Sequence, residues 1–342
     1  MKKIVYYITD HGMGHATRAI ALIQILKSNY EIIIRNSNNT NLFKESLDLT
    51  PFSTRVTDVG PKIKSDGITL DENKSKPVIS DWINSISINA SLEYDFLSKI
   101  NPDLIISDIS AMPFLAAKKF QIPSIAISNF SWLDVLCFIS SNELNILNQC
   151  YDYADYAIKL PFGTDMKHFS NIQKTKLISR NLTQSKSEIR KFLGINESDL
   201  IITVALGNSN LKIHLKSENN IKIISLGENI LTGNNIINLN SYIEGQNIIA
   251  ASDLVICKCG YGIVSECLSH GIPFFYIADN NHLEQKAISD ELSSLNLGRR
   301  IMFSDLENYY FTKKFIYDLK TSKKIPHDNI LTTSLISEFL DK

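Results

Sequence analysis

Short runs of β-branched and other apolar residues alternate with helical patterns through the first half of the chain. The runs are KIVYYIT, EIIIRN, STRVTDV, PDLIISD, PSIAISN and DYAIKLPF. Between the first two runs, apolar residues recur at positions 16, 19, 20, 23 and 26, which predicts an amphipathic helix over residues 16–28. Strands that alternate with helices are typical of βα units around a parallel sheet.

A second series of the same kind begins after a polar, irregular stretch that ends near residue 187. Its runs are LIITVAL, IKIISLG, NIINL, DLVICK, IPFFYI and GRRIMF. Ser185 or Ser187 is expected to cap the helix that contains SEIRKFLGI. Residues 62–81 are polar and lack periodicity, so we expect a long loop there.

The repeated pattern predicts an α/β fold with two Rossmann-like lobes that face each other across a cleft. We assign residues 1–178 to the first lobe, 179–325 to the second and 326–342 to a C-terminal helix. Parallel α/β sheets bind ligands at the carboxyl ends of their strands, so the cleft is the expected ligand site.

Charge and composition exclude some classes of function. The 35 basic and 36 acidic residues leave a net charge of -1, whereas nucleic-acid-binding proteins usually carry a basic stripe. The apolar runs are shorter than the roughly 20 residues that span a bilayer, and MKKIVYYITD lacks a signal-type cleavage site. Five irregularly spaced cysteines indicate reduced thiols and no metal site. We therefore expect a cytoplasmic protein.

One apolar stretch leaves membrane association open. Residues 129–141, NFSWLDVLCFISS, would suit either the interior of the first lobe, an acceptor pocket, or peripheral contact with the inner membrane face. Packing in the core or in an acceptor pocket is the favoured interpretation, because apolar runs of this length usually complete a domain interior.

The motif DHGMGHATR follows the first predicted strand. Gly12 and Gly14 allow the backbone to approach a ligand closely at the start of the helix, but Thr17 stands where a dinucleotide fingerprint needs its third glycine. His15 opens the helix, whose positive end favours the neutral imidazole that can accept a proton. We expect His15 to be catalytic, the alternative being a capping or packing role.

Four further polar residues complete the candidate site of the first lobe. Asp10 is expected to orient a neighbouring histidine or to cap the glycine turn, and His11 to contact substrate or solvent. Arg18 lies opposite the apolar stripe of the helix, so it would meet an anionic substrate group or be solvated. Asp108 follows LIIS at a strand end and is expected to contact the acceptor.

The second motif is ASDLVICKCGYGIVSECLSHGIPFFYI. Its glycine turn comprises Gly260, Tyr261 and Gly262, and the apolar stripe of the following helix leaves Ser265 and Glu266 on the other face. A carboxylate there could accept hydrogen bonds from the hydroxyls of a ribose while the amides of the turn bind a diphosphate. The alternative is an exposed helical glutamate.

Two other positions could add to a diphosphate site in the second lobe. Lys258 would contribute positive charge beside the phosphates. Gly207 and Asn208, in ALGNSN, would contribute backbone amides.

These two motifs, together with NNHLEQ, resemble those of the two-lobed GT-B glycosyltransferases. The resemblance extends to the peptidoglycan N-acetylglucosaminyltransferase group and to the glycosyltransferase-like N-terminal region of plant L-arabinokinases. It implies an acceptor site in the first lobe and a nucleotide site in the second. It also implies that His15 is the general base or steadies the leaving phosphate and that Glu266 holds the ribose. Glu284 and Gln285 match the pair that contacts the donor sugar, with Asn281 and His282 as additional contacts.

The implied activity is metal-independent transfer of a sugar from a nucleotide-diphosphate sugar to an acceptor hydroxyl, with no cofactor. A UDP-sugar is the favoured donor, and the acceptor is a glycan, a lipid-linked sugar or a small molecule. ALGNSN has one glycine where the peptidoglycan enzyme has a glycine-rich loop, so the donor type does not carry over. The alternatives are a nucleotide-sugar hydrolase or epimerase of the same fold, and a non-catalytic protein that binds a sugar or nucleotide.

Overall fold

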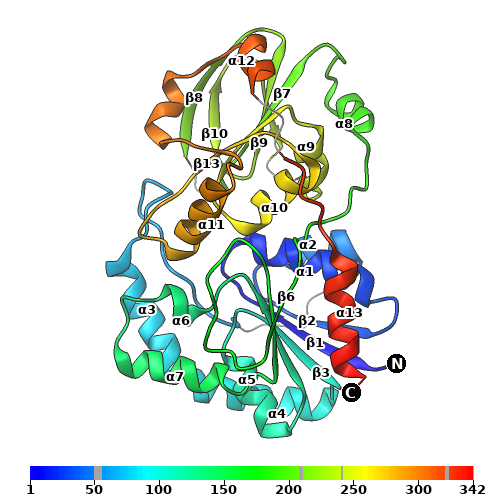
Figure 1. Cartoon of the computed structure of the whole chain (residues 1–342), viewed down its shortest axis with the longest axis vertical. Coiled ribbons are helices and arrows are strands. Elements are labelled where there is room, and N and C mark those ends of the chain that lie inside the picture. Colours follow the sequence, from blue (N-terminus) through cyan, green and yellow to red (C-terminus); the bar gives the residue numbers. More distant parts are fainter. Residues whose placement is uncertain (50–55, 208–210, 240–241, 320–322, 342) are drawn as a thin grey trace. The chain divides into compact units, whose positions relative to one another are not determined.

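The computed structural model describes residues 1–49, 56–207, 211–239, 242–319 and 323–341. The chain forms two compact units (Figure 1). The first unit comprises Met1–Lys62, Leu70–Ile178 and Asp328–Lys342, and the second comprises Ile63–Thr69 and Ser179–His327. The short segment Ile63–Thr69 differs from the division made on the sequence, because Ile68 is buried in the hydrophobic core of the second unit.

The first unit contains a six-stranded parallel sheet in the order β2-β1-β3-β4-β5-β6. Its strands are β1 (Lys3–Ile8), β2 (Glu31–Arg35), β3 (Leu104–Asp108), β4 (Ser124–Ser128), β5 (Tyr156–Lys159) and β6 (Ile172–Lys174). Five of the six predicted runs correspond to strands. The run STRVTDV was wrong in its described part, because residues 56–59 form no strand and Thr57 instead donates a hydrogen bond from Oγ1 to the carbonyl of Ile8.

The helices of the first unit follow the predicted alternation with one clear exception. They are α1 (Met13–Leu26), α2 (Thr40–Leu47), α3 (Glu72–Asn84), α4 (Ile86–Ile100), α5 (Met112–Phe120), α6 (Trp132–Val135), α7 (Ser141–Tyr151) and α13 (Asn329–Leu340). Helix α3 occupies residues 72–81, the second half of the stretch that we expected to be a loop. The carboxylate of Asp71 caps α3 by accepting the amide hydrogen of Lys74, a local signal that the polar composition concealed.

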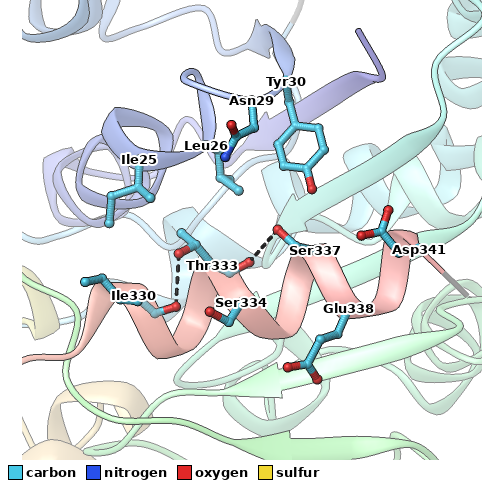
Figure 2. Close-up of a pocket in the computed structure, with 10 residues that line it drawn as sticks. All are labelled: Ile25, Leu26, Asn29, Tyr30, Ile330, Thr333, Ser334, Ser337, Glu338 and Asp341. Atoms are coloured by element: carbon cyan, nitrogen blue, oxygen red, sulfur yellow. Dashed lines mark hydrogen bonds between the residues drawn. The ribbon is translucent and has the colours of Figure 1, made fainter.

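The C-terminal helix α13 packs against α1, and Lys2 donates a hydrogen bond from Nζ to the carbonyl of Leu340. Between the end of α1 and α13 lies an open groove of about 650 Å³ (Figure 2). Its lining residues are Ile25, Leu26, Asn29, Tyr30, Ile330, Thr333, Ser334, Ser337, Glu338 and Asp341. Ile25 and Leu26 are at the C-terminal end of α1, whereas His15 is near its N-terminal end. The groove therefore lies at the opposite end of α1 from His15.

The second unit contains two parallel sheets. The larger has the order β11-β9-β7-β12-β13-β14, and the smaller has the order β10-β8-β15. The strands are β7 (Leu200–Ala205), β8 (Lys212–Ser217), β9 (Ile221–Leu226), β10 (Ile230–Gly233), β11 (Ile236–Leu239), β12 (Leu254–Lys258), β13 (Phe274–Ile277), β14 (Arg299–Arg300) and β15 (Tyr310–Phe311). All six runs predicted in this half correspond to strands, but we did not predict the smaller sheet.

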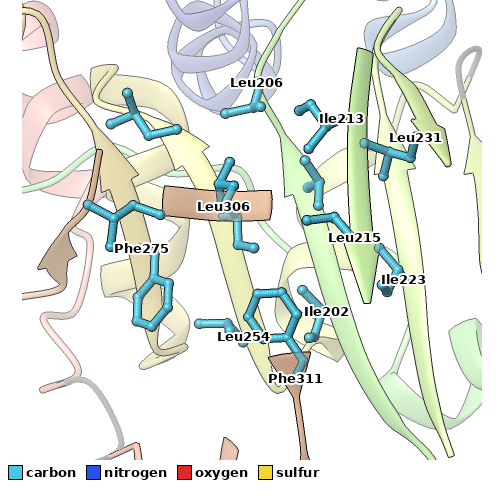
Figure 3. Close-up of a cluster of buried hydrophobic side chains, with 14 of the residues drawn as sticks. Ile202, Leu206, Ile213, Leu215, Ile223, Leu231, Leu254, Phe275, Leu306 and Phe311 are labelled. Atoms are coloured by element: carbon cyan, nitrogen blue, oxygen red, sulfur yellow. The ribbon is translucent and has the colours of Figure 1, made fainter. Parts of the chain in front are cut away.

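The two sheets of the second unit share one hydrophobic core (Figure 3). Strand β8 alternates exposed and buried residues, so Ile213 and Leu215 point toward the larger sheet, where they join Ile202, Ile223 and Phe275. An alternating strand of this kind buries one face and exposes the other.

The helices of the second unit are α8 (Lys186–Leu193), α9 (Gly245–Ala251), α10 (Tyr261–His270), α11 (Leu283–Ser294) and α12 (Lys313–Asp318), with a 3₁₀ helix at Phe303–Asn308. The predicted cap of α8 is confirmed at Ser185, whose side chain accepts the amide hydrogen of Glu188. Gly271 ends α10 in the left-handed conformation with φ 71°. None of the described helices is long and apolar enough to cross a membrane.

The apolar stretch over residues 129–141 lies inside the first unit. Five of its apolar side chains are buried, namely Phe130, Trp132, Val135, Leu136 and Ile139, and Leu133 and Phe138 are partly buried. Most of the stretch therefore forms part of the core, one of the two interpretations that the sequence favoured.

Candidate active site

The order of the first sheet explains which polar residues meet. Strand β1 lies next to β3, and β3 next to β4, so the carboxyl ends of these three strands are neighbours. The chain runs from β1 to β2 on one side and later returns to place β3 on the other, which makes this a topological switch point. His15 follows β1, Asp108 ends β3, and Ser128 ends β4, with Asn129 directly after it.

His15 and Asp108 form a buried hydrogen-bonded pair. Nδ1 of His15 lies 2.8 Å from Oδ1 of Asp108. Nη2 of Arg18 also lies near Nδ1, but the two hydrogens of that nitrogen have acceptors in Asp108 and Ser128. Nδ1 of His15 therefore carries a hydrogen and donates it to Asp108. In this tautomer Nε2 is unprotonated, and it has no hydrogen-bonding partner among the described residues.

Arg18 is buried, and both expectations for it, a substrate contact or solvation, were wrong. Its Nε donates to Oδ2 of Asp108 at 2.6 Å, and its Nη1 donates to Oδ1 of Asn129 at 2.6 Å. The apolar stripe of α1 suggested an exposed arginine because the sequence does not show that β3 and β4 bring acceptors to this side of the helix. Asp108 has no exposed surface, so the expected contact with the acceptor was also wrong.

The electrostatics of this group favour a neutral histidine beside an ionised carboxylate. Burial lowers the pKa of His15, the charge of Arg18 lowers it further, and Asp108 partly opposes both effects. Burial raises the pKa of Asp108, but Arg18 and His15 together hold that pKa below its ordinary value. The result is a neutral imidazole that is able to accept a proton at neutral pH.

Asp10 does not orient a histidine. Its carboxylate accepts amide hydrogens from Ser37 at 2.7 Å and from Thr57 at 2.8 Å, and so fixes two loops against the end of β1. Asp108 has the orienting role that the sequence assigned to Asp10. Asp10 is the nearest carboxylate to His15 in the sequence, whereas the hydrogen-bonding partner of His15 lies 93 residues away and comes close only through the sheet.

The glycine turn leads directly into α1. Gly12 precedes the helix with φ 80°, a conformation that favours glycine, and a Cβ there would meet no described atom within 4 Å. Gly14 lies in the first turn of α1. His11 is partly exposed and packs against Gly60, where a Cβ would lie 2.0 Å from its Nδ1.

In the second unit, the switch point lies between β7 and β12. Gly207 follows β7 with φ 68°, and Gly260 follows β12 immediately before α10. A Cβ at either glycine would meet no described atom within 4 Å, so a ligand could approach both stretches of backbone. Asn208, which we expected to add an amide here, lies outside the described residues.

Helix α10 begins at Tyr261, and its first amides point along the helix axis toward its N-terminus. Tyr261 and Gly262 are buried. Ser265 is buried as well, and its Oγ donates to the carbonyl of Gly262 at 2.9 Å. Ser265 is thus an internal brace of the helix, which differs from the exposed position that we expected.

Glu266 is buried and forms an ion pair with Arg180, so the alternative of an exposed helical glutamate was wrong. Nε of Arg180 donates to Oε1 of Glu266 at 2.9 Å, and Nη1 of Arg180 donates to the carbonyl of Ile243 at 3.1 Å. Oε2 of Glu266 has no partner among the described residues. The carboxylate therefore has one oxygen fixed and one available for a ligand.

Lys258 and helix α11 lie at the same edge of the larger sheet. Lys258 ends β12 and is half-buried, and burial lowers its pKa. His282 precedes α11, and its Nδ1 is buried without a partner among the described residues. Gln285 accepts the amide hydrogen of Asp279 with Oε1, and Glu284 lies in the first turn of α11. Asn281 is exposed in the loop before them.

The sequence reasoning missed several residues of these two groups. Asn129 ends the run PSIAISN, and a polar residue at a strand end was the signal that could have identified it. Arg180 lies in the polar, irregular stretch that ends near residue 187, where no sequence pattern identified it. Among the described residues, no group of three or more His, Cys, Asp or Glu side chains is arranged to hold a metal ion.

Comparison with solved structures identifies the fold. SnogD, a glycosyltransferase from Streptomyces nogalater, has a TM-score of 0.64 and 12% identity, covering 99% of this chain and 100% of its own. MurG of Acinetobacter baumannii has a TM-score of 0.55 and 13% identity, covering 99% and 100%. UGT89C1 of Arabidopsis thaliana, solved with UDP, has a TM-score of 0.56 and 12% identity, covering 99% and 91%. The chain therefore has the fold of the GT-B glycosyltransferases.

Sequence comparison identifies the family. The family model described as glycosyl transferase family 1 matches residues 2–320, so the chain belongs to that family and is a glycosyltransferase. L-arabinokinase of Arabidopsis thaliana is 25% identical over 321 residues, which cover 88% of this chain but only 30% of that protein. An uncharacterized glycosyltransferase of Methanosarcina mazei is 21% identical over 333 residues, covering 88% and 86%. The resemblance seen in the motifs is confirmed.

Proposed function

We propose that this glycosyltransferase moves a sugar from a UDP-sugar to an acceptor hydroxyl, with His15 as the general base. The observation that carries the proposal is the buried pair of His15 and Asp108, which leaves Nε2 of His15 unprotonated. Nε2 would take the proton of the acceptor hydroxyl while its oxygen attacks the anomeric carbon. The bond from that carbon to the diphosphate breaks, and UDP leaves. Asp108 would stabilise the imidazolium that forms.

The second unit would bind the donor. The N-termini of α10 and α11 offer backbone amides to the leaving diphosphate, and Lys258 adds a positive charge at the same edge. These groups support stabilisation of the diphosphate without a metal ion. The available Oε2 of Glu266 would accept a ribose hydroxyl, while Glu284 and Gln285 would contact the donor sugar.

An acceptor with an apolar portion suits a cavity in the first unit. The cavity has a volume of about 250 Å³ and is lined by Val56, Val59, Trp82, Asn89, Glu93 and Met112. The cavity is linked to the turn before His15 by the residues between the two valines. The amide of Thr57 donates to Asp10, and Thr9 donates to Asp58. A small molecule or the end of a glycan would fit better than a membrane-embedded lipid, since most of the large apolar side chains in residues 129–141 are buried.

Binding is tested first, by the melting temperature of the whole chain with UDP, GDP, TDP, CDP and ADP. A ligand at 100 times its dissociation constant stabilises the folded state by about 2.7 kcal/mol, which raises the melting temperature by several degrees. We expect UDP to give the largest shift. If no diphosphate stabilises the protein, the donor assignment is wrong.

Turnover is then measured as release of UDP from UDP-glucose, with glucose, 4-nitrophenyl glucoside or undecaprenyl phosphate as acceptor. His15→Ala should lower turnover about 100-fold or more while UDP still binds. The matched control is His214→Ala, because His214 is an exposed histidine on β8. Unchanged turnover in His15→Ala would refute the base assignment, and equal UDP release without any acceptor would indicate a hydrolase.

A further inference from the structure

A second buried carboxylate lies beside the glycine turn of the first unit. Asp58 is 1% exposed. Its Oδ1 accepts hydrogen bonds from Oγ1 of Thr9 at 2.5 Å and from the amide of Asp10 at 3.3 Å, and its Oδ2 accepts one from Nε1 of Trp132 at 3.0 Å. All three partners are donors, so the surroundings of Asp58 match an ionised carboxylate.

The indole of Trp132, which donates its hydrogen bond to Asp58, packs next to the rings of His11 and Phe130. The ring of Trp132 meets the ring of His11 edge-on, with 5.8 Å between centroids, and meets Phe130 at 5.6 Å. Phe130 in turn meets the ring of His15 at 5.8 Å. The position of Trp132 therefore determines the space that is available to both histidines.

Trp132 is also tied to the strand end that carries Asp108. Its backbone amide donates to Oη of Tyr151 at 3.2 Å, and Oη of Tyr151 donates to the carbonyl of Ile109 at 2.5 Å. Ile109 has φ 67°, a strained conformation for a β-branched residue, and it directly follows Asp108. One hydrogen-bonded network thus joins the turn before His15 to the residue after Asp108.

We infer that Asp58 is a positioning residue of this enzyme, whose ionised carboxylate holds Trp132 and the glycine turn in the arrangement that His15 needs for proton transfer. The inference rests on the proposed role of His15. Protonation of Asp58 would remove an acceptor in a place where the amide of Asp10 and the indole of Trp132 can only donate. The turn and the indole would then lose part of their support.

The charged and titratable groups around Asp58 make its protonation relevant near neutral pH. The pKa of Asp58 is raised to about 7, mainly by burial and also by the charge of Asp10, while the hydrogen bonds from Thr9 and Trp132 partly oppose this rise. Facing the same network are His11 on the turn, Asp134 on α6 and Tyr151 on α7. Burial holds the pKa of Tyr151 well above its ordinary value, so Tyr151 stays protonated.

The test combines a pH profile with a magnetic resonance signal that does not depend on activity. In the wild-type protein, kcat/KM should fall as pH falls through about 7, and a second fall should follow at lower pH as His15 becomes protonated. Asp58→Asn should lack the first fall, and at pH 8 its kcat/KM should be about 2- to 12-fold below wild type because the amide offers one acceptor fewer. Asp103→Asn is the control, because Asp103 also accepts a backbone amide hydrogen, that of Lys3 at 2.7 Å, but at the opposite end of β1, and it should keep the wild-type profile.

The chain has two tryptophans, Trp82 and Trp132, so their indole N–H resonances can be assigned with a Trp82→Phe variant. The Trp132 resonance should shift in the wild-type protein with an apparent pKa near 7, and the ring resonances of His11 and His15 should follow it. A Trp132 resonance that does not titrate between pH 5 and 9 overturns the inference, and so does an Asp58→Asn profile that keeps the first fall. If no donor is turned over, the proposed function fails, and the resonances of the two histidines still decide the inference.

Discussion

Replacement of Asp108 by asparagine tests the proposed base pair most directly. The amide has the shape of the carboxylate but offers one acceptor oxygen, so it cannot satisfy Arg18 at 2.6 Å and His15 at 2.8 Å together. A hydrogen bond to a charged group contributes about 1.5–3 kcal/mol. Since 1.36 kcal/mol corresponds to tenfold in rate, we expect kcat to fall about 10- to 150-fold.

The pH dependence gives the sign of the effect. Asp108 raises the pKa of His15, whereas burial and Arg18 lower it. Removal of the carboxylate charge leaves Arg18 unopposed, so the pKa of His15 falls further. The low-pH fall of kcat/KM that belongs to His15 should therefore move to lower pH in Asp108→Asn, although the plateau is lower.

Stability must be separated from catalysis, because Asp108→Asn also leaves the buried charge of Arg18 without its partner. Breaking a buried ion pair in this way costs about 3–5 kcal/mol of unfolding free energy. Asp253→Asn is a matched control, because it removes a carboxylate that lies 3.5 Å from the buried Arg190. Asp253 stands just before β12, at the opposite end of that strand from Gly260. It should lower the melting temperature but leave kcat per folded molecule unchanged.

The assay is initial-rate UDP release at saturating donor and acceptor, normalised to the folded fraction measured by circular dichroism. Two results would refute the reasoning. One is a kcat for Asp108→Asn within threefold of wild type. The other is a low-pH fall that moves to higher pH, since that would mean that Asp108 does not act on His15.

Two further predictions concern the donor site. Gly260→Ala should leave the melting temperature unchanged, because φ is -118° and the added Cβ meets no described atom within 4 Å, yet it should weaken UDP binding in calorimetry. Gly163→Ala provides the contrast, since its Cβ would lie 1.7 Å from the carbonyl oxygen of Asn129 and should destabilise the fold. Glu266→Gln should weaken UDP binding by about 1.5–3 kcal/mol, and 2',3'-dideoxy-UDP should then bind wild type and variant equally. A persistent difference with the dideoxy ligand would show that Glu266 acts through Arg180 and not on the ribose.

The local sequence predicted most strands, the glycine turns and the cap of α8 at Ser185, because each of these depends on neighbouring residues. Alternation of apolar runs with helical spacing identified the strands of both large sheets except β6, and Ser185 marked a helix start. The limits of this reasoning were also local. Helix α3 was hidden by its polar composition. The small sheet was missed because β8 alternates polar and apolar residues and so contains no continuous apolar run, and β15 has only two residues.

The partners of the charged side chains were decided only by the tertiary structure. His15 was identified from its place at the start of a helix, but its carboxylate partner lies 93 residues away, on a strand that the sheet order makes a neighbour of β1. In the same way, Glu266 was identified from its helix face, whereas Arg180 reaches it from 86 residues away. A burial pattern shows that a side chain lies on one face of an element. Which charge it meets depends on the order of strands in the sheet, and that order is set by packing across the whole domain.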